Sequence, residues 1–457
     1  MIKRTKWILG ILAAAGAAAQ TAPPGLTVGQ AVAAALRVYP SIRVNEEQMN
    51  AAAARIRLAQ TAYLPHVDTL VQVNRATRNT FYGLLLPQGV IPGVDGVPSN
   101  NFGTVWDSGA GILVTWEPFD FGLRAANVAA ASAARQEAEA GLRRTRFEVA
   151  VAAADAFLTA LAAEETAKAA RAAVSSWETL ARTIHGLVAA QLRPGADESR
   201  VQAELAAART QLAQAEQAID VARAAVAQFT GPELAELRLE GGRLVDSLPP
   251  DRPELPLQVA ANPLAVEQNA VIARDQALLQ SMERIYRPQF FVEGVAAARG
   301  TGLDTNGARP GALNGLAPTT QNYGLGLTVT FPVMDRFAVR EEQAAQAATI
   351  RAGQAQYRTV ATGLSARFQA ALARLRGARR VAENTPVEVS SARTALQQAS
   401  ARYQAGLAPI DDVAQAERLL AAAEIDNALA RLSVWRGLLD VAAARGDVSP
   451  FLAQAGS

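Results

Sequence analysis

The sequence contains no cysteine. This excludes disulfides, thiolate metal sites, a cysteine nucleophile and a lipidated N-terminal cysteine. Aromatic residues make up only 5% of the chain, although half of it is hydrophobic, because alanine supplies most of the apolar residues. Alanine has the best helix propensity and lets helices approach closely. The composition therefore favours long, tightly packed helices over an enzyme with an aromatic-lined pocket.

Patterns typical of an active site are also missing. The two histidines, His66 and His185, lie far apart in the chain, and neither is part of a metal-binding or catalytic motif. No HExxH, P-loop or GxSxG pattern occurs. We therefore expect no enzymatic activity, no cofactor and no metal.

The first residues have the pattern of a secretory signal peptide. A basic start with Lys3, Arg4 and Lys6 precedes a short apolar run over 7–15, and small residues over 17–19 suit a cleavage site. A buried N-terminal helix is the alternative. Removing 1–19 takes away three basic residues, which changes the formal net charge from +2 to about −1. We therefore expect no nucleic-acid partner.

The chain contains an internal duplication. Four landmarks recur in one order, the first two at an offset of 223 (263 − 40) and the last two at 215 (409 − 194). The landmark pairs are Pro40 and Pro263, Pro65 and Pro288, Asp120 and Asp335, and Pro194 and Pro409. We predict a first repeat over 20–229, a Gly- and Pro-rich linker over 230–256, a second repeat over 257–447 and a C-terminal tail over 448–457.

Each repeat is expected to hold two strands. Apolar and small or polar residues alternate over 67–74 and 109–116, and again over 290–296 and 322–331. The last segment, with Tyr323, Leu325 and Leu327 on one face, is typical of a strand between lipid and a wet lumen. A soluble sandwich strand is the alternative. Four strands cannot close a barrel, so a membrane-spanning barrel would need several chains: two would give about eight strands, and three would give about twelve with a wider lumen.

The helices are too long for a globular domain. Nothing breaks the helical pattern over 121–190, and apolar residues recur there at heptad spacing. Breaks at 192–197 and 406–412 precede further helices over 198–229 and 413–444, which gives each repeat a helical hairpin with an exposed tip. Pro386 is expected to kink the long helix of the second repeat. Such helices could wall a tube, or form a solid rod.

Two segments carry a family resemblance. The segments 26–42 and 402–413 are similar to the opening signature and the second periplasmic tip of the TolC-like outer membrane factor family. The resemblance implies an α+β membrane protein, a homotrimer with a 12-stranded β-barrel in outer-membrane lipid that continues into a long α-helical coiled-coil tunnel in the periplasm. It also implies a periplasmic adaptor protein and an inner-membrane RND or ABC transporter as partners.

The resemblance also assigns residues to the hairpin tips and the tunnel entrance. Small residues at the tips would contact the adaptor. The second tip has the family's glycine and the first tip lacks it: the tip residues are Ala190, Gln191 and Leu192, and Ala405, Gly406 and Leu407. At the entrance, Asp412 occupies the first of two positions that are often acidic, with Asp411 beside it, and Gln415 occupies the second. Acidic rings favour cations. Helix capping is the other role open to Asp411 and Asp412.

The sequence therefore predicts a passive outer-membrane channel subunit of a tripartite efflux or type I secretion system. The alternative is a structural or surface-adhesion coiled-coil protein without a conducting lumen.

Overall fold

The computed structural model describes residues 25–77, 104–236, 238–251, 255–302 and 313–456. The predicted signal peptide over 1–19 and nearly all of the loop between the first two predicted strands lie outside these residues. Among the described helices, none combines the length and apolar character needed to cross a membrane.

The chain divides into two compact units, and each takes segments from both predicted repeats. One unit comprises Met1–Tyr39, Phe147–Pro256 and Arg367–Ser457, and we call it the tip unit. The other comprises Pro40–Arg146 and Leu257–Ala366, and we call it the sheet unit. The predicted repeat boundaries remain a prediction.

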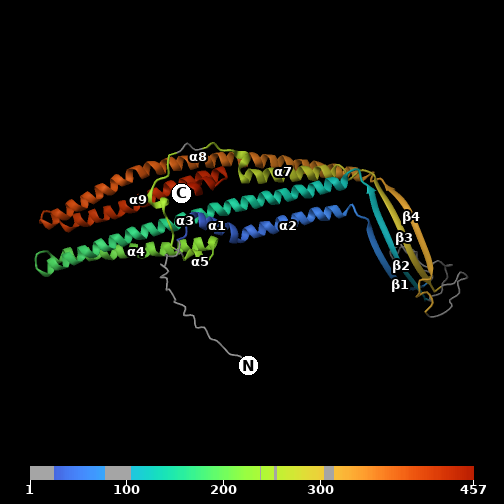
Figure 1. Cartoon of the computed structure of the whole chain (residues 1–457), viewed down its shortest axis with the longest axis horizontal. Coiled ribbons are helices and arrows are strands. Elements are labelled where there is room, and N and C mark those ends of the chain that lie inside the picture. Colours follow the sequence, from blue (N-terminus) through green and yellow to red (C-terminus); the bar gives the residue numbers. More distant parts are fainter. Residues whose placement is uncertain (1–24, 78–103, 237, 252–254, 303–312, 457) are drawn as a thin grey trace, which may run out of the picture. The chain divides into compact units, whose positions relative to one another are not determined.

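The sheet unit contains one antiparallel sheet with the strands in the order β1-β2-β3-β4 (Figure 1). All four predicted strands are present; the first three extend beyond their predicted ranges at both ends, and the fourth begins earlier and ends one residue earlier than predicted. Their bounds are β1 His66–Thr77, β2 Thr104–Phe119, β3 Gln289–Thr301 and β4 Thr320–Thr330. The strand pairs of the two repeats are joined where β2 pairs with β3, with Ile112 opposite Ala296. Among the described residues, β1 and β4 each pair on one side only.

The apolar face of β4 is uncovered in the single chain. Tyr323 is 94% exposed and Leu325 is 85% exposed, and every residue of the strand is exposed. Large apolar side chains in such numbers do not remain in water in a stable protein. The strand therefore needs a cover that the isolated chain does not supply.

The segment before the first strand forms two helices, α1 Val28–Val38 and α2 Pro40–Thr61. Thr27 and Gln30 form a capping box at the start of α1. Tyr39 between the helices is extended, with φ −66° and ψ 123°, because the residue before a proline is disfavoured in the helical region. The break falls at the proline landmark of the first repeat.

The long helices are α3 Leu123–Ala189 and α8 Asp335–Gln404. The heptad seam predicted for α3 is buried, as Ala153, Ala160 and Ala167 show, and alanine lets neighbouring helices approach closely there. α8 continues through Pro386 without ending, so the proline does not break the helix. Whether it kinks the helix remains a prediction. The sheet unit also holds α7 Pro263–Met282 and a short 3-10 turn over Val259–Ala261.

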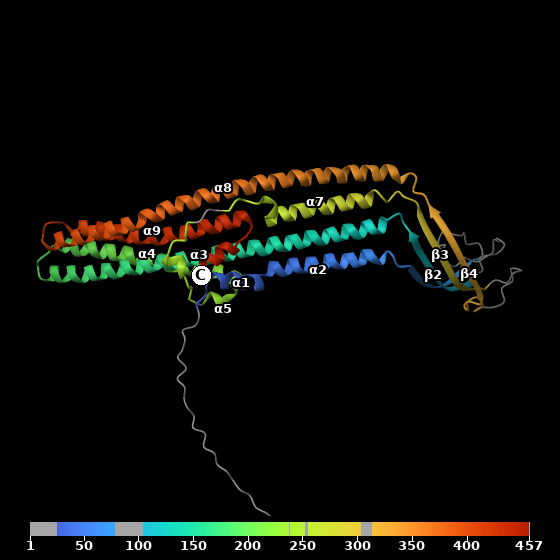
Figure 2. The same ribbon diagram turned by 45° about the horizontal axis from the view of Figure 1, so that its top comes forward.

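The tip unit contains two helical hairpins, α3 with α4 and α8 with α9 (Figure 2). Here α4 spans Gly195–Thr230 and α9 spans Ile410–Arg445. The unit also contains α1 and the short helices α5 Pro232–Ala235, α6 Arg243–Asp246 and α10 Ser449–Ala455. Trp435 of α9 is buried, packs its ring against Phe451 of α10 and donates its indole N–H to the Ser247 carbonyl at 3.1 Å. The segment predicted as a linker is thus attached to the helices of this unit.

Candidate functional site at the hairpin tips

The first hairpin tip is a tight turn that ends α3. Gln191 donates its N–H to the Val188 carbonyl at 2.9 Å, and Leu192 donates to the Leu187 carbonyl at 2.9 Å. These are the two hydrogen bonds of the Schellman motif, which satisfies carbonyl groups left free at the end of a helix. The position of Gln191 in this motif requires a left-handed backbone, and its φ is +58°.

The second tip repeats this turn. Gly406 donates its N–H to the Tyr403 carbonyl at 3.0 Å, and Leu407 donates to the Arg402 carbonyl at 2.8 Å. Gly406 has a φ of +77°. The first tip therefore forms the same backbone turn without the glycine, although a left-handed backbone is less favourable for a residue with a side chain.

All six predicted tip residues are exposed. The largest of them, Leu192 and Leu407, are 69% and 72% exposed, and Ala190 and Ala405, two residues before them, are small. Each tip thus presents one exposed leucine near an alanine. An exposed leucine can enter a complementary apolar pocket of a partner.

Directly behind the tips the two hairpins share one apolar core. Trp177 and Ile184 of α3, Val201 of α4, and Tyr403 and Val413 from the second hairpin belong to this cluster of buried side chains. Because the core takes residues from all four helices, a movement of one hairpin away from the other would expose it.

Polar contacts also join the two hairpins at this level. The Tyr403 hydroxyl donates a hydrogen bond to the Asp197 carboxylate at 2.8 Å. The Arg193 guanidinium lies 4.4 Å from the centre of the Tyr403 ring and donates to the Tyr403 carbonyl. We call Arg193, Asp197 and Tyr403 the tip clamp. No local sequence pattern indicated Arg193 or Asp197 as contacts of Tyr403.

The environment of Tyr403 keeps its hydroxyl protonated. The side chain is 3% exposed. Burial, together with the hydrogen bond to Asp197 and the charge of that carboxylate, raises the pKa of Tyr403 to about 12, although the nearby Arg193 acts in the opposite direction. The donor in the clamp is therefore present throughout the physiological pH range.

The predicted entrance residues lie in the first turns of α9. Pro409 is the N-cap residue, and no side-chain capping hydrogen bond is present. Asp411 instead forms an ion pair with Arg200 of α4, with 3.1 Å between the Asp411 Oδ1 and the Arg200 Nε. Both side chains are largely exposed, so this pair contributes little to stability. Asp412 is half-buried and has no ion pair among the described residues, and Gln415 is exposed.

Another titratable contact lies one to two turns further along α9. Ser176 of α3 donates its hydroxyl to Glu417 at 2.6 Å. Burial raises the pKa of Glu417, and the charge of Glu424 raises it further, against the hydrogen bond from Ser176. This half-buried carboxyl contact between the hairpins was not predicted, because it joins residues 241 positions apart.

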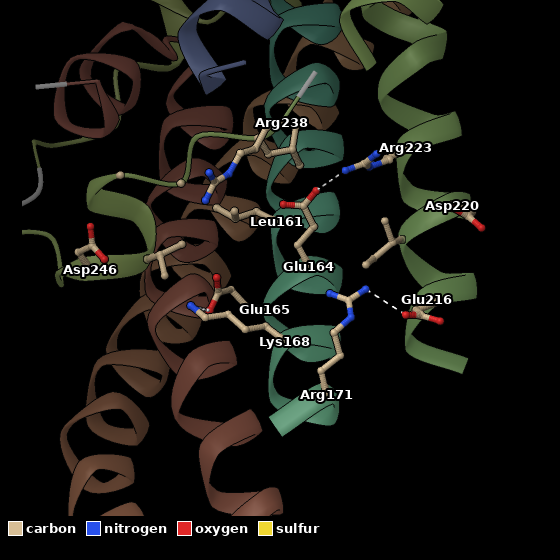
Figure 3. A pocket seen from close by; sticks show the side chains of 15 residues that line it. Leu161, Glu164, Glu165, Lys168, Arg171, Glu216, Asp220, Arg223, Arg238 and Asp246 are labelled. Atoms are coloured by element: carbon tan, nitrogen blue, oxygen red, sulfur yellow. Dashed lines mark hydrogen bonds and ion pairs between the residues drawn. The ribbon is translucent and has the colours of Figure 1, made fainter. Parts of the chain in front are cut away.

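The tip unit also contains an open pocket of about 740 Å³ between α3, α4 and the segment 238–246 (Figure 3). Ion pairs line it: Arg223 lies 3.0 Å from Glu164, and Arg171 lies 3.1 Å from Glu216. Most of its charged groups are thus already neutralised by each other. Among the described residues, no cluster of three or more metal-ligating side chains occurs in this pocket or elsewhere.

Comparison with known proteins agrees with this architecture. The model of the family described as outer membrane efflux protein matches residues 31–232 and 295–447. The outer-membrane channel OprN is 19% identical, with 92% of this chain and 89% of that chain covered and a TM-score of 0.72. The CmeC outer membrane channel of Campylobacter jejuni is 14% identical, with 94% and 89% covered and a TM-score of 0.73.

The MtrE outer membrane channel of Neisseria gonorrhoeae, solved in an open state, is 16% identical, with 92% and 89% covered and a TM-score of 0.72. At these identities the solved structures show a shared fold. No curated protein matches the chain. The family model covers more than half of the sequence, and the chain therefore belongs to the outer membrane efflux protein family, as an outer-membrane channel with a helical tunnel in the periplasm.

Proposed function

We propose that three copies of this chain form a passive conduit that accepts substrates from a periplasmic adaptor and an inner-membrane RND or ABC transporter. The open edges of β1 and β4 support the oligomer, since unpaired backbone groups are not tolerated in lipid. Pairing β4 of one copy with β1 of the next would satisfy both edges. It would also close the sheet into a ring of twelve strands.

The hairpin tips are the periplasmic entrance in this proposal, and the tip clamp holds it narrow. The carrying observation is the contact of Tyr403 with both Asp197 and Arg193, which joins the second hairpin to the first. A hydrogen bond to a charged group contributes about 1.5–3 kcal/mol, and a partly buried cation–π contact contributes about 0.5–2 kcal/mol. Three clamps in a trimer would thus hold the entrance by several contacts that an adaptor must break.

The tips themselves are proposed as the adaptor contact. Leu192 and Leu407 provide two apolar anchors per chain, and Ala190 and Ala405 leave room for a partner backbone beside them. Binding that separates the hairpins would supply the free energy needed to open the clamp. A ligand can shift such an equilibrium only if it binds the open form more tightly.

Conductance in planar bilayers tests the proposal. The purified wild-type oligomer should conduct weakly. The double variant with Tyr403→Phe and Asp197→Asn should have a mean conductance several-fold higher. Tyr357→Phe is the matched control, because Tyr357 lies on the same helix and outside the clamp. A rod-like adhesion protein would give no conductance from any of these variants. Equal conductance of wild type and double variant would remove the clamp from the proposal but leave the conduit intact.

A further inference from the structure

At one end of the sheet, all four strands connect to helical segments. β1 starts at this end, β2 finishes there, β3 starts there and β4 finishes there. The register brings Phe119 opposite Phe290 and Gln289 opposite Thr330. Residues just beyond these positions therefore lie side by side along one line, which we call the helix-side rim.

Large apolar side chains are exposed along the helix-side rim. Met334 is 75% exposed, and several aromatic and aliphatic neighbours are also uncovered. The exposed set comprises Tyr63, Leu64, Phe119, Phe121, Ile285, Tyr286, Phe331, Val333, Met334 and Phe337. Aromatic residues of this kind are enriched where a membrane protein crosses from hydrocarbon to water. The rim is thus suited to the boundary of the membrane.

Two arginines accompany these apolar residues without a carboxylate partner. The Arg287 guanidinium lies 6.0 Å from the centre of the Phe121 ring, and that of Arg336 lies 5.6 Å from the Phe337 ring. Both side chains belong to exposed residues, and neither forms an ion pair among the described residues. Among the described residues, the rim therefore presents two guanidinium groups without an ion pair next to apolar surface.

Another arginine at the rim has a different role. Arg124 is buried, binds Asp120 with 2.9 Å between Nε and the carboxylate, and donates to the Ala62 carbonyl at 3.1 Å. Its hydrogen bonds join β2 to the end of α2, so it is structural. Arg287 and Arg336 have no comparable contacts and remain available for a ligand outside the chain.

We propose that Arg287 and Arg336 each bind the phosphate group of an anionic phospholipid in the periplasmic leaflet of the outer membrane. The guanidinium group matches phosphate geometry with two parallel hydrogen bonds, and an aromatic ring behind it restricts its orientation. The acyl chains of the same lipid would cover the apolar side chains of the rim. The inference rests on the outer-membrane location of the chain, and it does not depend on the tip clamp or on conduction.

The charge arrangement favours this occupant over a second copy of the chain. Another copy would need acidic groups facing Arg287 and Arg336, whereas β1, the free edge expected to meet β4, begins with His66, Val67 and a single acid, Asp68. Asp68 already lies 3.1 Å from His66. A lipid phosphate supplies both the negative charge and the adjoining apolar surface.

Lipid retention tests the site. The intact oligomer, in detergent with added phosphatidylglycerol or phosphatidylcholine, is analysed by native mass spectrometry. The wild type should retain phosphatidylglycerol about tenfold more than phosphatidylcholine, and Arg287→Gln with Arg336→Gln should abolish this preference. Arg351→Gln with Arg358→Gln, two exposed arginines further along α8, should keep it. Retention without preference in the wild type, or an unchanged preference in the rim variant, would overturn the proposal.

A second measurement identifies what covers the rim. Because the chain has no cysteine, Met334→Cys provides a single labelling site. A fluorophore there should be quenched by brominated phospholipid in reconstituted vesicles. A label that is shielded from this quencher, and that cross-links one copy to another, would show that a second copy covers the rim and would reject the lipid.

Discussion

Gln191 and Gly406 occupy the same position of the same turn at the two hairpin tips. Each has a positive φ, +58° for Gln191 and +77° for Gly406, and each donates its N–H to the carbonyl three residues earlier. A side chain in this conformation costs about 1–2 kcal/mol, which glycine avoids. The first tip therefore contains local strain that the second tip lacks.

We predict that Gln191→Gly stabilises the folded protein by about 1 kcal/mol and that Gly406→Gln destabilises it by a similar amount. No atom lies within 4 Å of a Cβ built at Gly406, so the effect would come from the backbone alone. Urea unfolding of the oligomer measures both. Gly195→Ala is the control, because that glycine also faces open space but is not among the residues with positive φ.

The same positions should differ in export. A bulky residue at Gly406 combines backbone strain with a larger tip, whereas Gln191 already has a side chain. Gly406→Trp should therefore weaken export more than Gln191→Trp, in a cell-based efflux assay with matched expression. Equal losses from the two variants would contradict the assignment of the second tip as the more sensitive contact.

Alkaline pH should open the tip clamp. The pKa of Tyr403 is raised from 10.0 to about 12. A group with a raised folded-state pKa contributes stability that is full below the unfolded value and is lost as pH rises through the folded value. Wild-type conductance should therefore rise between pH 10 and about 12. Tyr403→Phe should already conduct more at pH 8 and should lack this rise; an identical rise in the variant would exclude Tyr403 as its origin.

Much of the fold follows from local sequence patterns. Alternation with a period of two predicted all four strands, because apolar residues recur at every second position over much of each strand. Apolar residues at heptad spacing predicted a long helix over 121–190. The split of α1 from α2 depends on Tyr39, whose extended backbone is imposed by the proline after it.

The contacts of the candidate site were less accessible to sequence reasoning. Tyr403 and Asp197 are 206 positions apart, and no local pattern pairs them. Asp411 was expected either to cap its helix or to contribute to an acidic entrance, and the structure gives it an ion pair with Arg200 instead of a capping hydrogen bond. Which helices face each other is decided by packing of the whole chain, so such pairs appear only in three dimensions.

Ionisation of Glu417 should weaken the contact between the hairpins as pH rises. Burial raises its pKa above the ordinary value of 4.5. The stability that neutral Glu417 contributes is therefore full below pH 4.5 and is lost as pH rises through the folded-state pKa. Glu417→Gln, which can still accept from Ser176, should raise the melting temperature at pH 7.5 and have little effect at pH 4. A difference of equal size at both pH values would show that ionisation of Glu417 has no part in it.

Asp412 should set the ion preference of the entrance. Asp411 is partly neutralised by Arg200, whereas Asp412 has no ion pair among the described residues. Three copies around one axis would bring three Asp412 carboxylates together, and an acidic ring favours cations. Asp412→Asn should shift the reversal potential in a KCl gradient toward that of a non-selective pore, and Gln415→Asp should shift it the opposite way by adding a second ring.

Asp426→Asn, which changes an exposed acid further along α9, is the control for a general change in charge. If Asp412→Asn and Asp426→Asn shift the potential equally, the selectivity arises from the overall charge of the helices and not from the first turn of α9.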